Sequence, residues 1–436
     1  MNSSSSIRNE GDALASERHE QVKEALVVAV LLLAACGSDD DTSGGGGKGG
    51  GGGTSGASGN AGSGGGSAGA SGGSAGGNTG GAPSGGTGGA SGGASGSAGG
   101  GGVPGVVPGL AWTPKTPTEV GLTESALSSF SASIGGRGVV VKDGYLAYTW
   151  GNASQKGDIA SAAKPIYGFF LFKAVEQKLL PSIDAKAAPL IPGLAALNPS
   201  LGNKDASISF RHFATQTSCY GVSEDPGTAF DYNDWQMALF WDTLFLQVWK
   251  ATYDDVDSKL LGPELCSRID CQDAPTFLAF GKNDRAGRVS ISPRDFARFA
   301  LLYLRGGSWN GTTLLPASTI TEIVTSPLPN SIPQTQAKEA QMLAGQRSIG
   351  SNVKPDNQTD HLGSYSFMWW MNGVDRNGKR LLPSAPTDTY MAAGHGGKRS
   401  AVVIPSKDMV VSWNDTNIDS FDKVDAALKL LLAAVK

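Results

Sequence analysis

The sequence carries little charge and few of the residues that metal and nucleic-acid sites need. Only 17% of the 436 residues are charged, and the formal net charge is −4. No run of lysine and arginine is interleaved with aromatic residues, so we expect no nucleic-acid partner. The histidines stand far apart, and none is paired with cysteine at ligand spacing: His19, His212, His361 and His395. We therefore expect neither a metal site nor a cofactor.

The apolar run near the N-terminus is too short to cross a bilayer. Residues 25–35 read ALVVAVLLLAA, which has the length of the hydrophobic region of a signal peptide, and basic residues precede it. The run ends Leu33-Ala34-Ala35-Cys36, which resembles the lipobox of bacterial lipoproteins. That resemblance implies that residues 1–36 are a lipoprotein signal segment and that Cys36 is lipidated after cleavage. The alternative is an ordinary signal peptide cut after Ala35.

Large apolar side chains are missing from the stretch that follows. Glycine makes up 33 of the 59 residues from 44 to 102, and most of the others are serine, alanine and threonine. Such a chain cannot bury enough surface to offset its backbone entropy. We predict a disordered tether over residues 37–110 and one folded region over residues 111–436. A Gly/Ser chain of about 70 residues spans about 45 Å on average, enough to hold the folded region off a membrane.

The folded region has strand-like segments near both ends and helix-like segments between them. Residues 138–142 and 145–150 flank Asp143-Gly144, a strong hairpin signal. Helices are predicted over residues 159–180, 209–215, 233–248, 293–304, 316–325 and 422–435, and strands over 364–370, 380–382, 397–404 and 409–413. The first of these helices should begin near Ser161, because Pro165 is tolerated in a first turn. The order predicts an α/β (α+β) protein in two lobes. An antiparallel sheet covered by N- and C-terminal helices would form one lobe, and helices alone the other.

Ser161 and Lys164 form an S-x-x-K pattern at the predicted start of a helix. This spacing places the hydroxyl and the amine on one helix face. Serine is a weak nucleophile until a base takes its proton, and lysine serves as that base when its surroundings lower its pKa. The pattern alone is weak, because a capping serine followed by a solvated lysine has the same spacing. Two later segments favour the catalytic interpretation, Tyr232-Asn233-Asp234 and Gly394-His395-Gly396-Gly397.

In this order the three motifs resemble those of the serine β-lactamase and penicillin-binding-protein superfamily. The most similar branch is the class C-like group of β-lactamase-related esterases and D-Ala-D-Ala peptidases. Residues 208–218, 287–299 and 307–311 are also similar to segments of that family. The resemblance extends over about residues 130–435. It implies a fold like that of β-lactamases and transpeptidases.

The resemblance also implies roles for individual residues. Ser161 would be the acylated nucleophile, Lys164 its proton partner, and Tyr232 the group that moves protons to the leaving group and from the deacylating water. The backbone N–H groups of Ser161 and Lys398 would bind the oxyanion. The residues implied to lie against the substrate are His395, Gly396, Gly397, Lys398 and Asp234.

Two departures from the family pattern affect the predicted activity. Asp234 stands where the family usually has asparagine, and a carboxylate there would raise the pKa of Lys164 and weaken it as a base. His395 stands where β-lactamases have lysine, which contacts the substrate carboxylate. Both departures argue against an efficient β-lactamase.

We expect a lipid-anchored serine hydrolase of the bacterial cell envelope that forms an acyl-enzyme. Its substrate would be a small-molecule or peptidoglycan-type ester, amide or lactam. The alternative, which Asp234 keeps open, is a non-catalytic cell-surface protein that binds peptidoglycan or another ligand on the same fold.

Three cysteines follow the tether, and the sequence does not decide how they pair. Cys219, Cys266 and Cys271 allow three single disulfides, each of which leaves one thiol over. None of them stands at a predicted helix start beside a base. A cysteine nucleophile is therefore disfavoured against Ser161.

Overall fold

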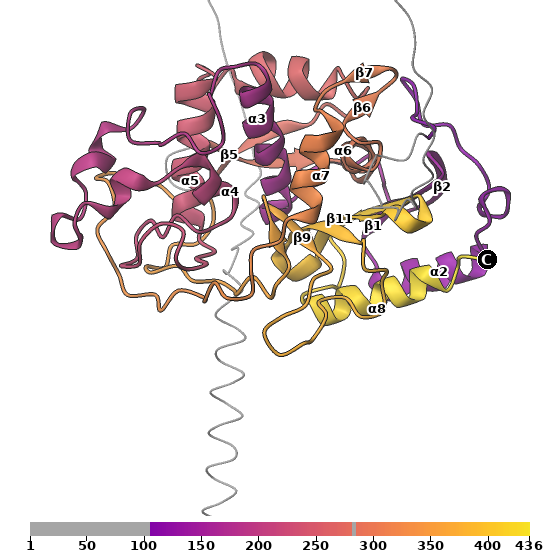
Figure 1. Ribbon diagram of the computed structural model, residues 1–436. Coiled ribbons are helices and arrows are strands. Elements are labelled where there is room, and N and C mark those ends of the chain that lie inside the picture. The colour runs from indigo at the N-terminus through magenta and orange to yellow at the C-terminus, as the bar shows by residue number, and fades with distance from the viewer. Residues whose placement is uncertain (1–104, 281–284) are drawn as a thin grey trace, which may run out of the picture. The chain divides into compact units, whose positions relative to one another are not determined.

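The computed structural model describes residues 105–280 and 285–436 (Figure 1). The predicted signal segment, Cys36 and nearly all of the predicted tether lie outside these residues. Inside them, Arg305 Nε donates to the carbonyl of Val106 at 3.2 Å and Arg298 Nη1 to that of Gly109 at 2.9 Å. The ordered contacts therefore begin a few residues before the predicted boundary at residue 111. No helix in the described ranges is long and apolar enough to span a membrane.

A seven-stranded sheet joins the two ends of the folded region. Its order is β2-β1-β12-β11-β10-β9-β8, and every neighbouring pair is antiparallel. The strands are β1 (Arg137–Lys142), β2 (Tyr145–Trp150), β8 (Tyr365–Ser366), β9 (Trp369–Met371), β10 (Tyr390–Gly394), β11 (Arg399–Ile404) and β12 (Met409–Asn414). Val140 of β1 lies opposite Val411 of β12, so the first hairpin pairs with the last strand. The predicted antiparallel sheet is confirmed.

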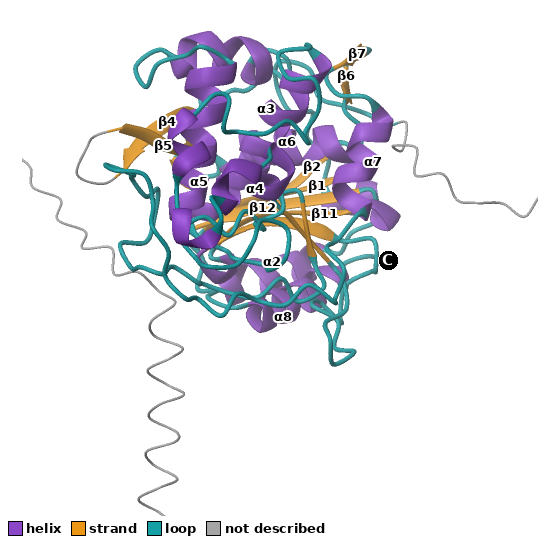
Figure 2. Ribbon diagram, turned by 60° about the vertical axis from the view of Figure 1, so that its left-hand side comes forward, coloured by secondary structure: helices purple, strands orange, loops and turns teal. Residues whose placement is uncertain are grey.

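Two helices from opposite ends of the folded region cover one face of this sheet. They are α2 (Glu124–Ile134) and α8 (Phe421–Leu432), which lie side by side below the strands in Figures 1 and 2. Alternate residues of the strands meet them in one apolar cluster that includes Leu127, Phe130, Val140, Val402, Val411, Leu428 and Leu431. The predicted terminal helices are therefore present, and the period-two alternation of the strands explains why only one set of valines faces them.

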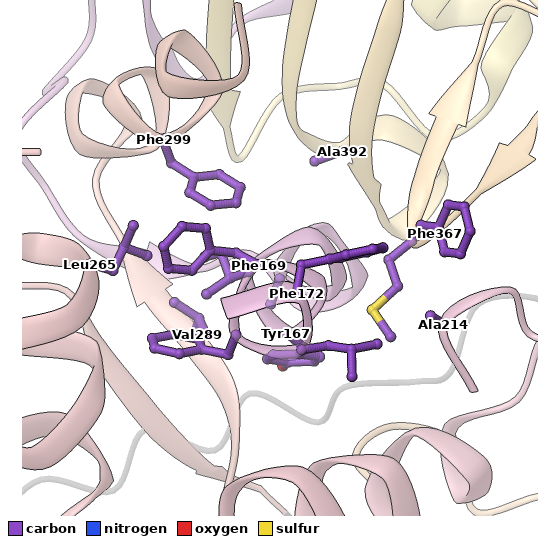
Figure 3. Packing of buried hydrophobic residues seen from close by; sticks show 14 of the residues in the cluster. Tyr167, Phe169, Phe172, Ala214, Leu265, Val289, Phe299, Phe367 and Ala392 are labelled. Carbon is purple, nitrogen blue, oxygen red and sulfur yellow. The ribbon is translucent and has the colours of Figure 1, made fainter. Parts of the chain in front are cut away.

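The other face of the sheet carries α3 (Lys164–Glu176) and α6 (Pro293–Leu304). Phe169 of α3 meets Phe299 of α6 edge to face at 6.3 Å, and Phe299 stacks on Trp369 of β9 at 6.1 Å. Figure 3 shows the rings of Phe169 and Phe299 next to each other between their two helices. Helix α3 is apolar around most of its circumference, as expected for a helix enclosed between a sheet and a second lobe.

The second lobe contains α4 (Phe210–Ala214) and α5 (Asp234–Trp241), which continues as a π-helical segment, Asp242–Val248. It also contains a three-stranded sheet that the sequence did not predict. This sheet has the order β3-β5-β4, formed by Gly157–Asp158, Arg285–Ile291 and Thr276–Phe280. Farther along the chain, α7 (Ala317–Thr325) packs against β8 and β9.

Two predicted strands differ from the structure. Residues 364–370 were expected to form one strand, but the chain reverses at Phe367 and Met368, both with positive φ, which separates β8 from β9. Residues 380–382 make only an isolated bridge, between Arg380 and Val374. In both places short apolar runs look like strands in the sequence, and only the sheet partners decide whether they pair.

The three described cysteines are all free. Cys219 is buried and donates weakly to the carbonyl of Ala229 at 3.5 Å. Cys266 and Cys271 are neighbours, and the adjacent Cys266 thiol together with burial raises the pKa of Cys271. The pair of cysteines closest in sequence is thus also the pair that the fold brings together.

Candidate active site

Ser161 lies in a tight 3-10 turn, Ala160–Ala163, directly before α3. Lys164 Nζ donates to Ser161 Oγ at 2.9 Å. Asp158 stabilises this turn, because its carboxylate accepts the backbone N–H of Ala160 at 2.7 Å. Ala160 itself has a positive φ of 49°, a conformation that costs a non-glycine residue free energy and is often found at functional sites. The Ser161 hydroxyl therefore lies just before the N-terminus of the buried helix α3, in contact with the Lys164 amine.

Tyr232 is brought to the same amine from the second lobe. Lys164 Nζ lies 4.5 Å from the centroid of the Tyr232 ring. The ring is fixed by other aromatic side chains, with Tyr365 at 5.8 Å and Trp370 at 6.0 Å between centroids. Ser161, Lys164 and Tyr232, which are separated by up to 71 positions in the sequence, thus form one cluster.

Asp234 completes this cluster, and both of its carboxylate oxygens are engaged by protein donors. Its Oδ1 accepts Lys164 Nζ at 3.3 Å. Its Oδ2 accepts the backbone N–H of Ser351 at 3.1 Å and Nε2 of Gln358 at 2.9 Å. A substrate would therefore have to displace one of these donors to reach the carboxylate.

The charges of this cluster are set by mutual attraction. Burial lowers the pKa of the Lys164 amine, but the Tyr232 oxygen and the Asp234 carboxylate raise it by more, so the pKa lies above its ordinary value. Burial likewise raises the pKa of Asp234, but Lys164 and the donors on its carboxylate lower it by more. The resting site therefore holds an ammonium and a carboxylate, and Lys164 acts as a donor to Ser161 rather than as a free base.

Residues 349–358 form a covering segment over the tyrosine motif. The backbone N–H of Gln358 donates to the carbonyl of Tyr232 at 3.1 Å, and Trp235 Nε1 donates to the carbonyl of Val353 at 2.9 Å. Gly350 passes so close to the motif that a Cβ placed there would lie 1.9 Å from Asp234 Oδ2. Sequence reasoning missed this segment, because no motif marks it and its contacts join residues more than 100 positions apart.

A second carboxyl group, that of Asp356, belongs to the covering segment and accepts the backbone N–H of Asp234 at 2.8 Å. Burial and the negative charge of Asp234 raise the pKa of Asp356 to about 6. A carboxyl whose pKa is raised on folding binds its proton more tightly in the folded protein. Its contribution to stability is therefore present below its unfolded pKa and is lost as the pH rises to about 6.

We expect Asp356→Asn to remove this loss of stability at higher pH. An asparagine oxygen still accepts the Asp234 N–H but carries no charge. Between about pH 4 and about pH 7, the wild type should lose about 2–3 kcal/mol of unfolding free energy relative to the variant. Urea unfolding at the two pH values measures the difference. Asp254→Asn, at an exposed aspartate, is the matched control. Equal pH dependence in the wild type and Asp356→Asn would show that this carboxyl is not titrating on folding.

The end of β10 meets the nucleophile turn backbone to backbone. A Cβ on Gly394 would lie 2.4 Å from the carbonyl oxygen of Ile159 and 3.3 Å from the backbone nitrogen of Ser161. Only glycine lets the two segments approach so closely. Gly394 belongs to the sequence motif but was not among the predicted contact residues, and its absolute need for a small side chain is visible only from the packing.

The rest of the predicted substrate strand is arranged as a turn between β10 and β11. Residues 395–397 form a 3-10 turn, and the backbone N–H of Lys398 donates to the carbonyl of His395 at 3.2 Å. His395 and Lys398 are exposed. Gly396 and Gly397 make their close contacts with the protein itself, since a Cβ would lie 2.0 Å from the carbonyl of Asp419 or 2.4 Å from Val424. A substrate role for these four residues stays a prediction.

Metal chemistry was not expected from the sequence. Among residues 105–280 and 285–436, no three or more histidine, cysteine, aspartate or glutamate side chains are grouped to hold a metal ion. The polar groups near Ser161 are instead joined to one another by hydrogen bonds.

Comparison with solved structures identifies the fold. A protein assigned as a 6-aminohexanoate-dimer hydrolase from Bacillus anthracis superposes with a TM-score of 0.52 at 14% identity, over 74% of this chain and 87% of its own. One assigned as a β-lactamase from Bacteroides dorei gives 0.51 at 14% identity, over 72% and 97%. A penicillin-binding-protein homologue from Caulobacter crescentus gives 0.50 at 12% identity, over 74% and 99%. No protein-family model matches the sequence, and no curated protein matches it.

These likenesses define the class of fold. The mixed α/β architecture, with an antiparallel sheet, terminal helices on one face and a second lobe on the other, is the β-lactamase/transpeptidase fold. At identities of 12–14% the similarity extends to the fold and leaves the activity to be argued from the site.

Proposed function

We propose that this protein is a serine hydrolase that forms an acyl-enzyme on Ser161. The observation that carries the proposal is the hydrogen bond from Lys164 Nζ to Ser161 Oγ at 2.9 Å, at the start of a buried helix and beside Tyr232. A surface serine followed by a solvated lysine would not bury the amine, whereas the Lys164 side chain is only 2% exposed. Burying an ammonium group costs free energy, which a lysine without a function at this position would not justify.

The charge state of the site determines the proposed route of the proton. In this proposal Tyr232 reacts as a phenolate that has released its proton to solvent, and the Lys164 ammonium stabilises its negative charge. The Ser161 proton passes to this phenolate oxygen. Ser161 Oγ attacks the substrate carbonyl carbon, and Tyr232 then donates that proton to the leaving group. In the second half, water gives its proton to the Tyr232 oxygen as it attacks the acyl carbon. Tyr232 passes that proton to Ser161 Oγ as the acid departs, which restores the starting site.

The oxyanion formed during acylation and again during deacylation needs nearby N–H donors. The backbone N–H of Ser161 stands beside the end of β10, where Gly394 leaves space. The backbone N–H of Lys398 is the second donor in this proposal. At rest it donates to the carbonyl of His395, so it would exchange that acceptor for the oxyanion.

The proposed substrates are esters, amides or lactams of small-molecule or peptidoglycan type, as in the esterase and peptidase branch of the class C-like group. Asp234 occupies the place of a neutral amide, and His395 the place of a lysine that binds carboxylates. An efficient β-lactamase would lack both features. The similar structures include proteins assigned as a dimer hydrolase, a β-lactamase and a penicillin-binding protein, which frame this range of substrates.

Covalent labelling tests the proposal. Purified full-length protein is treated with a fluorescent fluorophosphonate and, separately, a fluorescent penicillin, and the labelled peptide is identified by mass spectrometry. We expect fluorophosphonate on Ser161, with weak or no penicillin labelling. Ser154→Ala, at an exposed serine, should label like the wild type. Absence of label from native protein, or label on a different serine, would contradict the proposal.

The buried ion pair favours a second candidate, a non-catalytic receptor. An ammonium locked to Asp234 at 3.3 Å accepts no proton, so the fold would only bind peptidoglycan or another ligand. This candidate predicts no acylation of Ser161 by either reagent and retention on insoluble peptidoglycan.

Asp234→Asn separates the two candidates further. Removing the carboxylate takes away the partner that competes with the Tyr232 oxygen for the Lys164 ammonium, and a cluster with one negative charge fewer loses its protons at lower pH. In a hydrolase, kcat/KM for p-nitrophenyl acetate should equal or exceed that of the wild type, and its pH profile should shift toward lower pH. In a receptor, the variant should remain inactive at every pH. Circular dichroism and urea unfolding would verify that the covering segment tolerates the change.

We also propose that the protein is exported and lipid-anchored in the bacterial cell envelope. The support is in the sequence alone, namely the signal-like residues 1–36, the lipobox ending at Cys36 and the Gly/Ser tether over residues 37–110. Cys36→Ser should abolish metabolic labelling with palmitate and move the protein to the soluble fraction. Wild-type protein that takes up no palmitate would contradict this proposal.

A further inference from the structure

Asp158 is the last residue of strand β3 and stands three positions before Ser161. Its backbone is held from two sides. Across the β3–β5 pair it lies opposite Ser290, and Asn414 Nδ2 of β12 donates to its carbonyl at 3.4 Å. The Asp158 carboxylate therefore has a fixed place beside the turn that carries Ser161, where the second lobe meets the main sheet.

Both oxygens of this carboxylate are engaged, and their partners come from three parts of the chain. Oδ1 accepts the backbone N–H of Ala160 in the turn at 2.7 Å. Oδ2 forms ion pairs with Nη2 of Arg288 at 2.5 Å and with Nη1 of Arg399 at 3.5 Å. Arg288 belongs to β5, and Arg399 is the first residue of β11. One carboxylate thus joins the nucleophile turn to a strand of each sheet.

Arg399 connects this carboxylate to the proposed oxyanion donors. It directly follows Lys398, whose backbone N–H is the second donor, and it lies opposite Gly394 in the β10–β11 pair. Gly394 in turn meets the nucleophile turn, since a Cβ on it would lie 3.3 Å from the backbone nitrogen of Ser161. A group that holds Arg399 and the turn together therefore sets the separation of the two N–H donors.

The charge of Asp158 matters to this arrangement as well as its hydrogen bond. The Arg288 side chain is 6% exposed and that of Arg399 is 14% exposed, so water offsets little of either positive charge. Without the carboxylate, both charges would be uncompensated, and the two cations would repel each other. A neutral residue at position 158 would therefore loosen the start of β11 even where the hydrogen bond to the turn is kept.

We propose that Asp158 is a positioning residue, which holds the nucleophile turn and the start of β11 in register so that the Ser161 and Lys398 N–H groups converge on one oxyanion. It acts through Ala160 and Arg399, and its kinetic effect rests on the proposed hydrolase function. Because the same oxyanion arises in acylation and deacylation, loss of this register should slow both steps. We therefore expect a lower kcat with little change in KM.

The kinetic test, on the full-length protein, separates charge from hydrogen bonding. Asp158→Asn retains an oxygen for the Ala160 N–H but removes the charge, so kcat for p-nitrophenyl acetate should fall at least about tenfold. Arg399→Met should cause a similar loss, and Arg399→Lys, which keeps the positive charge, should recover most of the activity. The double variant Asp158→Asn, Arg399→Met should be no slower than the slower single variant, because both substitutions remove the same ion pair.

Asp408→Asn is the matched control. It breaks an ion pair of similar length and burial, in which Arg305 Nη1 lies 2.6 Å from Asp408 Oδ1 and the side chains are 3% and 23% exposed. Asp408 follows the end of β11 opposite to Arg399. The control should lower the melting temperature about as much as Asp158→Asn and leave kcat unchanged. Equal losses of kcat in the two variants would show that Asp158 acts only through stability, which would overturn the proposal.

Amide hydrogen exchange, measured by mass spectrometry, tests the contact without any turnover. Asp158→Asn should speed exchange in peptides that cover residues 159–164 and 395–400, whereas Asp408→Asn should leave both at the wild-type rate. Wild-type protein that neither hydrolyses the ester nor takes up the fluorophosphonate would contradict the hydrolase proposal, and the exchange rates would still decide this one. Unchanged exchange of both segments in Asp158→Asn would show that the carboxylate does not hold them together.

Discussion

Ser161→Ala is expected to lose about 10³-fold or more in kcat for p-nitrophenyl acetate, and all fluorophosphonate labelling. The alanine removes the oxygen that must become covalently bound to the acyl group. The same hydroxyl is the acceptor for Lys164 Nζ at 2.9 Å, so the variant also frees the ammonium from one partner. No comparable loss is expected at an exposed serine, for which Ser154→Ala is the matched control.

The three catalytic side chains should act as a unit. Lys164→Met leaves the Tyr232 oxygen without its cation, and Tyr232→Phe leaves the serine proton without an acceptor. Each single substitution should therefore lower kcat nearly as much as the double substitution Ser161→Ala, Tyr232→Phe. The losses of the single variants should not multiply in the double variant. Steady-state kinetics of the single and paired variants measure this. Independent, multiplying losses would indicate that the three side chains do not share one proton path. Wild-type ester hydrolysis by Ser161→Ala would rule out the hydrolase proposal.

Gly394→Ala should lower kcat/KM about 100-fold, although residue 394 carries no reactive group. The added Cβ would lie 2.4 Å from the carbonyl oxygen of Ile159, a contact that neither backbone can relieve by rotating a side chain. The turn that carries Ser161 must therefore move, and misplacement of about 1 Å at a reacting atom is enough for such a loss. The melting temperature should fall as well, because the clash lies between a strand and a buried turn.

The control for this variant is Gly109→Ala, where a Cβ would have no atom within 4 Å. It should change neither kcat/KM nor the melting temperature by a measurable amount. An active, stable Gly394→Ala variant would show that the β10 strand and the Ser161 turn have more room than their backbone contact implies.

Local signals in the sequence predicted the elements on which the site is built. Asp143 and Gly144 both have positive φ, at 54° and 82°, as the predicted hairpin turn requires. Pro165 falls in the first turn of α3, where its missing N–H costs nothing. Such signals succeed because each depends on a few adjacent residues.

The elements to which no residue range was assigned from the sequence depend on distant partners. Strand β10 reads YMAAG and contains few β-branched or aromatic residues, so its extended form comes from pairing with β9 and β11 on either side. Helix α2 has apolar residues at the right spacing, but the serines between them weaken its helical propensity. Packing against α8 and the sheet stabilises it in the fold.

Part of the candidate site could likewise be predicted from local motifs, and part depends on distant contacts. The order of the three motifs was enough to nominate Ser161, Lys164 and Tyr232, which the fold places together. The covering segment was not predictable, because the hydrogen bonds of Ser351 and Gln358 to Asp234 join parts of the chain 117 and 124 positions apart. The close contact of Gly394 with Ile159 was not predictable either, because the segments of the second lobe lie between these two residues in the sequence.

The pairing of β1 with β12 has a consequence for the order in which the molecule can be assembled. Arg137 lies opposite Asn414, so β1 has to wait for a partner strand that lies more than 270 positions later in the sequence. A chain that is made from its N-terminus cannot close its main sheet until β12 has followed the whole of the second lobe. Until then β1 has a free edge, and contacts so distant in sequence form slowly. The main sheet is thus completed only after the segments that form the second lobe have been made.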